Sequence, residues 1–198
     1  MFEPAQFFGL KKGGILKVVI GSGNTKYQGW YHTQEDELNL LDQNTFEKLF
    51  SNRGVAIFLA EHVWEHLTFE EGIIAAQNCF KFLKPGGLLR VAVPDRFFKN
   101  EWYQNMVQVG GPGPKDHPAA SHKIVYDYKS FSQVFQEAGF NTNLLEYCDE
   151  DGCFHYKYWN QEDGMIGRSY RFDTRNSGDS LGMVSIILDA YKPLIIEP

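Results

Sequence analysis

Three short apolar runs in the first half of the chain predict buried strands. Residues 15–20 (ILKVVI), 54–60 (GVAIFLA) and 87–94 (GLLRVAVP) are almost continuously apolar and rich in β-branched side chains. Continuous runs, rather than an alternation of apolar and polar positions, are typical of strands covered on both faces in a parallel sheet. We therefore expect an α/β fold.

A helix is predicted between the second and third runs. Thr68 and Glu71 have the spacing of a capping box, in which each side chain bonds the backbone N–H of the other residue. Apolar residues then recur at helical spacing, at positions 73, 76, 80 and 83, before residues 84–87 (KPGG) end the pattern. Strand, helix and strand in this order form a βαβ unit, which is almost always right-handed.

The second half of the chain has a different pattern. Apolar positions 131, 134, 135 and 138 predict a second helix that ends at Gly139, and residues 143–148 and 183–192 predict two strands. The segment between these strands is rich in turn residues, so we expect an antiparallel end to the sheet. Residues 96–122 show no firm periodicity. A connection of this length is more often functional than accidental, so we expect it to be an inserted lid or substrate segment of a single domain, residues 1–198.

The composition and net charge limit which binding partners and which cellular compartment we expect. The chain has 19 Lys and Arg against 25 Asp and Glu, a net charge of −6, and no basic run longer than Lys11-Lys12; this argues against a nucleic-acid partner. The apolar runs are too short to span a bilayer, so no membrane partner is expected. The 3 cysteines form no C-x-x-C pair, which favours a reduced, cytoplasmic setting. The sequence gives no oligomeric state.

A glycine loop directly follows the first predicted strand. Gly21-Ser22-Gly23 stands where an α/β sheet binds ligands, beyond the carboxyl end of a strand. Lys26 occupies the place of the third glycine of the dinucleotide fingerprint. A cofactor loop and a plain tight turn both remain open from these residues alone.

The segment after the second predicted strand contains H-x-x-E-H, formed by His62, Glu65 and His66. One class of zinc peptidases uses this pattern, with both histidines in the middle of a helix so that they converge on one ion. Here the motif lies between a strand and the capping box at Thr68. We therefore expect a loop that lines a ligand or caps the next helix, with no metal; a metal-dependent hydrolase is the weakest alternative.

Taken in order, several segments carry a resemblance to a known family. LKVVIGSG, AIFLAEHVWEHL, CFKFLKPGGLLRVAVPD and SHKIVYDYKSFSQVFQEAGF together resemble the small class I S-adenosylmethionine-dependent methyltransferases of the type 11-like branch, over about residues 15–192. The resemblance implies a Rossmann-like sheet, mostly parallel with an antiparallel C-terminal end, and S-adenosylmethionine as cofactor. Because only residues 24–28 separate Gly23 from Gly29, we expect the first crossover helix to be shortened or absent.

The resemblance also implies cofactor contacts. These are the glycine loop (Gly21, Ser22, Gly23), Glu61 beside the methyl donor, and Asp42 at the adenine end. In this superfamily an acidic residue at the end of the second strand holds the ribose hydroxyls, because a carboxylate matches a vicinal diol. Gln34 stands at that place here, with Glu35 or Asp36 as a substitute after a small shift of register.

Catalytic and substrate roles follow from the chemistry of methyl transfer. The reaction is an in-line displacement that depends on positioning, and an oxygen or nitrogen acceptor must also lose a proton, for which histidine is suited. We expect His62 or His66 to act as general base or to position the acceptor, with Glu65 orienting an imidazole. Trp64, His117 and His122 are the expected substrate contacts, and the expected acceptor is a small molecule or a sugar. The alternative is a degenerate relative that keeps the fold as a binding or regulatory module, which the presence of Gln34 favours.

Overall fold

The computed structural model describes residues 15–51, 54–177 and 180–194; the pair Lys11-Lys12 lies outside them. They form one sheet in the order β2-β1-β3-β4-β7-β5-β6. The strands are β1 (Lys17–Ile20), β2 (Tyr31–His32), β3 (Val55–Glu61), β4 (Leu83–Pro94), β5 (Asn141–Cys148), β6 (Phe154–Tyr156) and β7 (Ser185–Tyr191). The α-helices are α1 (Gln43–Phe50), α2 (Phe69–Phe82), α3 (Glu101–Val107) and α4 (Tyr128–Glu137), with short 3₁₀ turns η2 (Trp64–His66), η3 (Pro118–Ser121) and η4 (Gln161–Asp163).

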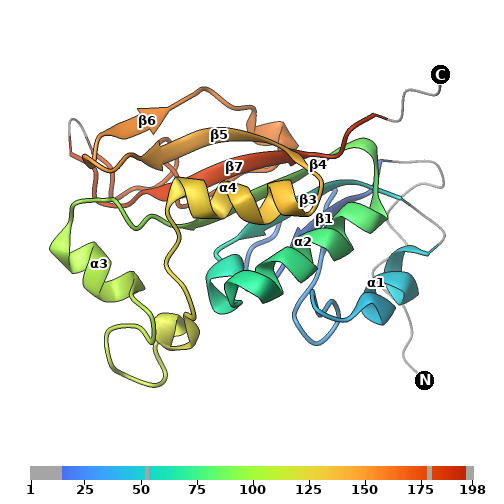
Figure 1. Ribbon diagram of the computed structural model, residues 1–198, viewed down its shortest axis with the longest axis horizontal. Coiled ribbons are helices and arrows are strands. Elements are labelled where there is room, and N and C mark those ends of the chain that lie inside the picture. Colours follow the sequence, from blue (N-terminus) through green and yellow to red (C-terminus); the bar gives the residue numbers. More distant parts are fainter. Residues whose placement is uncertain (1–14, 52–53, 178–179, 195–198) are drawn as a thin grey trace.

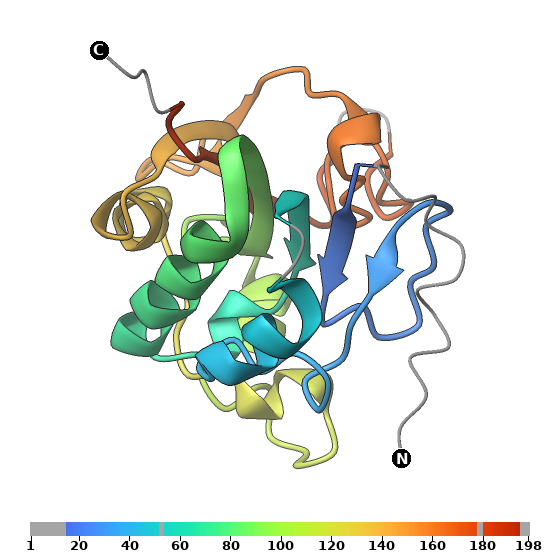
Figure 2. The ribbon, with the colours of Figure 1, turned by 90° about the vertical axis from the view of Figure 1, so that its right-hand side faces the viewer.

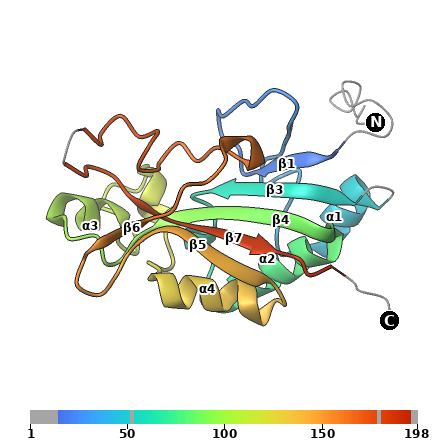
Figure 3. The ribbon, with the colours of Figure 1, turned by 90° about the horizontal axis from the view of Figure 1, so that it is seen from above.

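The sheet is mostly parallel and becomes antiparallel toward its C-terminal strands, as the sequence predicts. β2, β1, β3 and β4 are parallel neighbours. β7 lies antiparallel between β4 and β5, and β6 pairs antiparallel with β5 at the edge. Figure 3 shows the strands from β1 to β5 side by side. The carboxyl ends of β1 and β3 therefore meet at one edge of the sheet, which is where this kind of fold binds ligands.

Helices cover one face of the sheet and irregular chain covers the other. α1, α2 and α4 lie together on one side, while the segment between β6 and β7 crosses the opposite side (Figures 1 and 2). The main core lies under the helices, where Phe46 of α1 packs edge-on against Phe58 of β3 and stacks on Phe82 of α2. This aromatic layer holds the helices against β3, the strand that leads into the site. No helix in the described ranges is long and apolar enough to cross a membrane.

α2 begins where the capping box predicts. The Thr68 hydroxyl accepts the Glu71 N–H at 3.2 Å, and the Glu71 carboxylate accepts the Thr68 N–H at 2.8 Å. The helix ends at Phe82, and β4 starts at once, earlier than the expected residue 87. The pairing jumps from Leu83 opposite Val55 to Leu88 opposite Ile57, so the glycine-rich residues between them form a bulge within the strand.

The connection from β1 to β2 contains turns and no helix, as the short spacing predicts. Residues 21–30 run directly from one parallel strand to the next. α1 was not predicted; it is only 8 residues long and buries only Phe46 and Phe50. The second strand that the resemblance implies before Gln34 is present but has only two residues. The glycine loop therefore leads into β2 through turns, with no crossover helix between the two strands.

Candidate functional site

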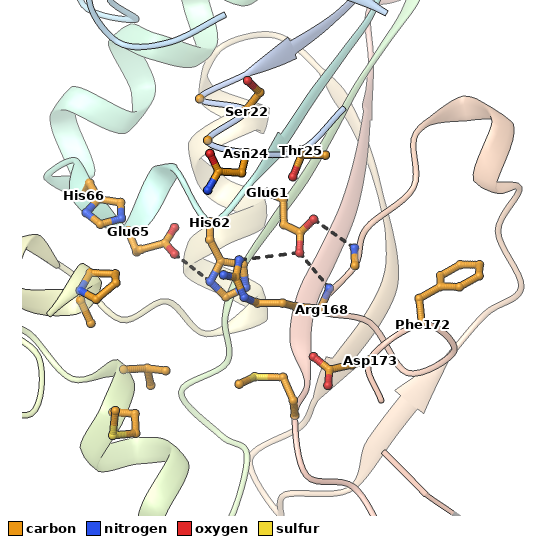
Figure 4. Close-up of a pocket in the computed structure, with 18 of the residues that line it drawn as sticks. Ser22, Asn24, Thr25, Glu61, His62, Glu65, His66, Arg168, Phe172 and Asp173 are labelled. Carbon is orange, nitrogen blue, oxygen red and sulfur yellow. Dashed lines mark hydrogen bonds and ion pairs between the residues drawn. The ribbon is translucent and has the colours of Figure 1, made fainter. Parts of the chain in front are cut away.

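A cavity of about 1120 Å³ opens at the carboxyl ends of β1 and β3. It is walled by the glycine loop, by the connection from β3 to α2, by α3 and η3, and by residues 167–175. Figure 4 shows Glu65 between His62 and His66. Ser22 of the glycine loop and the residues that follow the loop, Asn24 and Thr25, lie above them. The volume exceeds the ~300–1,000 Å³ of ordinary small-molecule sites, which leaves room for two ligands side by side.

The glycine loop needs its glycines for conformation. Gly21 and Gly23 have φ of +58° and +52°, a left-handed region in which most side chains are strained. A Cβ on Gly21 would lie 3.0 Å from a methyl group of Val63, whereas a Cβ on Gly23 would meet nothing within 4 Å. The loop is anchored to β2 because Ser22 N–H donates to the carbonyl of Thr33 at 2.9 Å.

Gln34 supports this loop from outside the cavity. Its Nε2 donates to the Gly23 carbonyl at 2.8 Å and to the Ser22 hydroxyl at 3.2 Å, and its Oε1 accepts the Gly23 N–H at 3.3 Å. An aspartate here could not donate to either oxygen. Gln34 therefore holds the shape of the glycine loop, and any effect it has on a bound cofactor passes through Ser22 and Gly23.

Two residues expected at the cofactor do not reach the cavity. Asp42 is the N-cap of α1, where its carboxylate accepts the Asn44 N–H at 3.0 Å. Asp36 lies exposed on the turn after β2 and does not line the cavity. The expectation for Asp36 placed it at the end of the second strand, but β2 ends after two residues, so the chain turns away first. Asp42 was expected at the adenine end, but it is used as the cap of α1.

Glu61 lines the cavity, but its carboxylate is already engaged. It accepts the N–H groups of Gly167 and Arg168 at 3.0 and 2.8 Å, and Nη1 of Arg168 lies 3.7 Å away. These bonds fasten residues 167–175 over the cavity, a wall that the sequence did not predict. Within this wall Asp173 pairs with Arg175 at 2.6 Å, and no local pattern marks either residue as part of a site.

His62 occupies a strained position at the end of β3. It is the only non-glycine residue with positive φ, +57°, in the part of the chain that the structure describes. Its Nδ1 lies 3.0 Å from Oε1 of Glu65, and its Nε2 lies 3.1 Å from the Ser185 hydroxyl. Strain of this kind costs about 1–3 kcal/mol and concentrates at functional sites. The turn thus points the imidazole of His62 into the cavity, where the ring lies between Glu65 and Ser185.

Glu65 is fully buried beside three imidazoles. Nε2 of His122 lies 4.0 Å from its Oε1, and the rings of His66 and His122 are 4.9 Å apart. Burial favours the neutral carboxyl, but the charge and hydrogen bond of His62 outweigh it and hold the pKa of Glu65 below its ordinary value. Burial also lowers the pKa of His122. The site thus combines a carboxylate with an imidazole that stays neutral.

The sequence and the fold of the chain can be compared with those of known proteins. No protein-family model and no curated protein matches the sequence. Solved structures do match: a methyltransferase from Archaeoglobus fulgidus, described as dependent on S-adenosylmethionine, superposes with a TM-score of 0.53 at 12% identity, covering 95% of this chain and 90% of that one. The chain has the fold of the S-adenosylmethionine-dependent methyltransferases.

Two further matches are weaker. A possible histamine N-methyltransferase from Thermotoga maritima matches with a TM-score of 0.48 and 13% identity over 89% of this chain and 82% of that one. An O-methyltransferase family protein from Burkholderia thailandensis matches with a TM-score of 0.47 and 10% identity over 84% of this chain, which spans only 36% of that longer protein. At these identities the likeness concerns the methyltransferase fold.

The glycine loop of this methyltransferase fold suits S-adenosylmethionine, the cofactor that the fold implies. The left-handed Gly23 leaves open space where a Cβ would stand, so a ligand can approach the backbone closely. Ser22, Asn24 and Thr25 supply polar side chains on the cavity wall, and none of them is acidic. The residues present fit the cofactor with neutral partners in place of the expected carboxylate.

Of the three residues expected to contact the substrate, two line the cavity and one does not. His117 and His122 line the cavity, brought there by residues 96–122, which contain α3 and η3. Trp64 does not: it is buried in the core, where its indole N–H donates to the Gly72 carbonyl at 3.1 Å and its ring packs on Phe135. The expectation for Trp64 is wrong because η2 turns this apolar side chain toward the core, while the next two residues, Glu65 and His66, line the cavity.

Proposed function

We propose that the protein transfers a methyl group from S-adenosylmethionine to a small-molecule or sugar acceptor. The observation that carries this proposal is that the glycine loop and the histidine–glutamate group open into one cavity in a methyltransferase fold. A cofactor site and a group able to handle protons are what the reaction needs, since methyl transfer depends on in-line positioning and on removal of the acceptor proton.

In this proposal the glycine loop holds the cofactor, which supplies an electrophilic methyl group when bound. Gly21 and Gly23 give the backbone close approach, and Gln34 keeps their conformation. Glu61 holds residues 167–175 across the cavity and so helps to exclude water. The cofactor's neighbours are thus fixed before it binds, which reduces the ordering that binding requires.

The acceptor side of the cavity is formed by the histidines and by α3. Glu65 lies 3.0 Å from Nδ1 of His62, so it can orient this imidazole while Nε2 takes the acceptor proton. For that role the acceptor must replace Ser185 at Nε2 of His62. Trp102 lines the same side and is 57% exposed, which leaves its ring face available to a sugar or another flat ligand.

Binding calorimetry with S-adenosylmethionine and its demethylated product tests the proposal. We expect one molecule of either ligand to bind, and Gly23→Asn to weaken binding by about 10-fold or more, because a side chain there fills the open space against which the ligand lies. Gly29→Asn is the matched control: Gly29 also has positive φ and open space around its Cβ, but it does not line the cavity. Asparagine tolerates this backbone region best among the other residues.

The results separate the enzyme from a non-catalytic binding module. Binding lost in Gly23→Asn and kept within about two-fold in Gly29→Asn supports a functional cofactor site. No heat at millimolar ligand would overturn the proposal and favour the degenerate module. With an acceptor in hand, unchanged turnover in both His62→Ala and His66→Ala would exclude these histidines as the general base.

We also propose a cytoplasmic setting without nucleic-acid or membrane partners. The three cysteines are free thiols, with Cys79 and Cys148 buried and Cys153 exposed. An exposed free thiol is typical of a reducing compartment. The net charge of −6 disfavours binding to phosphate backbones and to anionic membrane surfaces.

A further inference from the structure

We propose that Glu65, His66 and His122 bind a divalent cation of the zinc class at the wall of the cavity. One carboxylate oxygen and one nitrogen from each imidazole all lie within 4.8 Å of one another. Two imidazoles and a carboxylate are a common ligand set for zinc and for other divalent transition metals. Binding of the cation does not depend on the proposed methyl transfer and goes beyond it.

The Glu65 carboxylate is the strongest evidence for a cation at this site. The residue is fully buried, and within the described residues neither of its oxygens has a hydrogen-bond partner of regular geometry, although Nδ1 of His62 lies 3.0 Å from Oε1. Buried carboxylates without such partners are rare, because the lost hydration is not replaced. A cation would satisfy the oxygens that the protein leaves open.

The two imidazoles are oriented as metal ligands require. Nδ1 of His122 lies 2.9 Å from the Val107 carbonyl, which can only accept, so this nitrogen carries the proton and Nε2 carries the lone pair. In the neutral imidazole that lone pair lies 4.0 Å from Glu65 Oε1, so two electron-rich atoms face each other across a gap that a cation can fill. Nδ1 of His66 lies 2.7 Å from the Ser121 hydroxyl, and its Nε2 has no hydrogen bond to any residue that the structure describes. Outer contacts of this kind orient metal-bound histidines.

The site is assembled differently from that of a zinc peptidase. Lys123 N–H donates to the Glu65 carbonyl at 2.8 Å, and this backbone bond brings His122 beside η2. His122 thereby takes the place that the first histidine of H-x-x-E-H has in a peptidase, while His62 contacts Glu65 and positions it. The proposal departs from the expectation that the motif binds no metal, which was based on the lack of a long helix and of a marked third ligand.

The distances suit a cation after small shifts of the rings. Zinc ligands at 2.0–2.1 Å in a tetrahedron are about 3.3 Å apart, so Nε2 of His122 and Oε1 of Glu65, now 4.0 Å apart, have to approach by roughly 0.7 Å. The three ligand atoms lie within 4.8 Å of one another, so no pair has to approach by more than about 1.5 Å. Three protein ligands leave at least one coordination position, as in catalytic zinc sites. Because all three ligands line the cavity, that position is available to water or to an oxygen of an acceptor.

Titration of chelator-treated, full-length protein with Co²⁺ and Zn²⁺ tests the site without any measurement of activity. We expect one Co²⁺ per chain with the visible absorption bands of a low-coordinate, histidine-bound ion, and displacement by Zn²⁺. Glu65→Gln and His122→Gln should each weaken binding by about 100-fold or more, and His62→Gln by about 10-fold, since it loses a positioning contact only. His155→Gln is the control, because this exposed histidine pairs with Asp149 away from the cavity.

Thermal unfolding of each variant shows whether it is folded, and His66→Gln provides a second ligand variant if another fails. Absence of stoichiometric Co²⁺ binding by the unaltered protein would overturn the proposal. Equal binding in the His122→Gln and His155→Gln variants would also overturn it, as would a loss in His62→Gln as large as that in His122→Gln. S-adenosylmethionine calorimetry on the same preparations separates failure of the cation site from failure of the proposed methyl transfer.

Discussion

Arg90 and Glu65 are both buried charged residues, but their surroundings differ. Nε and Nη2 of Arg90 donate to the Asp189 carboxylate at 2.7 and 2.8 Å, and its Nη1 donates to the carbonyls of Asn160 and Gly164, both at 2.7 Å. Glu65 has one imidazole at 3.0 Å and oxygens without regular hydrogen bonds among the described residues. One buried charge is neutralised and almost fully bonded by the protein, and the other is left partly open.

The difference separates a structural group from a functional one. Arg90 joins neighbouring strands β4 and β7 and ties η4 to the sheet, so its bonds are complete without a ligand. Glu65 lies in η2, shortly after β3, on the cavity wall, where incomplete bonding is tolerated because a ligand or a proton can complete it. We therefore expect substitution of Arg90 mainly to lower stability and substitution of Glu65 mainly to lower function.

The largest expected loss of stability is that of Arg90→Met. It leaves the Asp189 carboxylate buried with only the Tyr191 hydroxyl at 3.1 Å, and breaking a buried pair costs about 3–5 kcal/mol. Urea unfolding followed by circular dichroism measures the change. Replacing both partners, as in Arg90→Met with Asp189→Leu, should recover part of the lost stability because no unpaired buried charge remains. A loss of unfolding free energy in the double variant equal to the sum of the two single losses would contradict this account.

Asp95 is an intermediate case and gives a pH-dependent effect. Its carboxylate accepts the N–H groups of Phe97 and Cys148 at 2.8 and 2.6 Å, yet burial outweighs these bonds and raises its pKa from 3.8 to about 6. The folded state therefore binds a proton that the unfolded state has lost between about pH 4 and 6. The protonated Asp95 therefore contributes to the free energy of unfolding fully below about pH 4. This contribution, roughly 3 kcal/mol at most, is lost as the pH rises through about 6.

Asp95→Asn should remove this pH dependence, because the amide does not titrate. The measurement is the free energy of unfolding of both proteins at pH 4, 5, 6 and 8. We expect the difference to shift in favour of the variant from pH 4 to about pH 6 and to stay nearly constant from there to pH 8. A constant difference at all four values would show that Asp95 titrates normally.

The smallest expected change in stability is that of Glu65→Gln. Removing a buried charge with few bonds relieves desolvation while losing the contact with His62, so we expect a change of less than about 1 kcal/mol. Methyl transfer, in contrast, should fall by about 100-fold or more, as expected when a proton-handling group is disabled. A stability loss as large as that of Arg90→Met would show that Glu65 is structural and end the contrast between the two residues.

The elements were predictable where local patterns are strong. The buried strands and α2 follow from continuous apolar runs and from the Thr68–Glu71 capping box, which act over a few neighbouring residues. α1 was missed because it is only 8 residues long and buries only two phenylalanines, and the second strand that the resemblance implies is only two residues long. For the site, the glycine loop and the position of His62 and Glu65 at a strand end were predicted, since both follow directly from the strands that precede them.

By itself, then, the sequence determined the α/β class, the glycine loop and the place of H-x-x-E-H, because these depend on contacts between near neighbours. Only the tertiary structure decided which of these side chains share a site. It brought His122 to Glu65 through the Lys123 backbone bond, turned Trp64 into the core and kept Asp36 and Asp42 away from the cavity. Long-range pairing and the direction of each side chain on a turn depend on the whole packed chain, which local patterns do not contain.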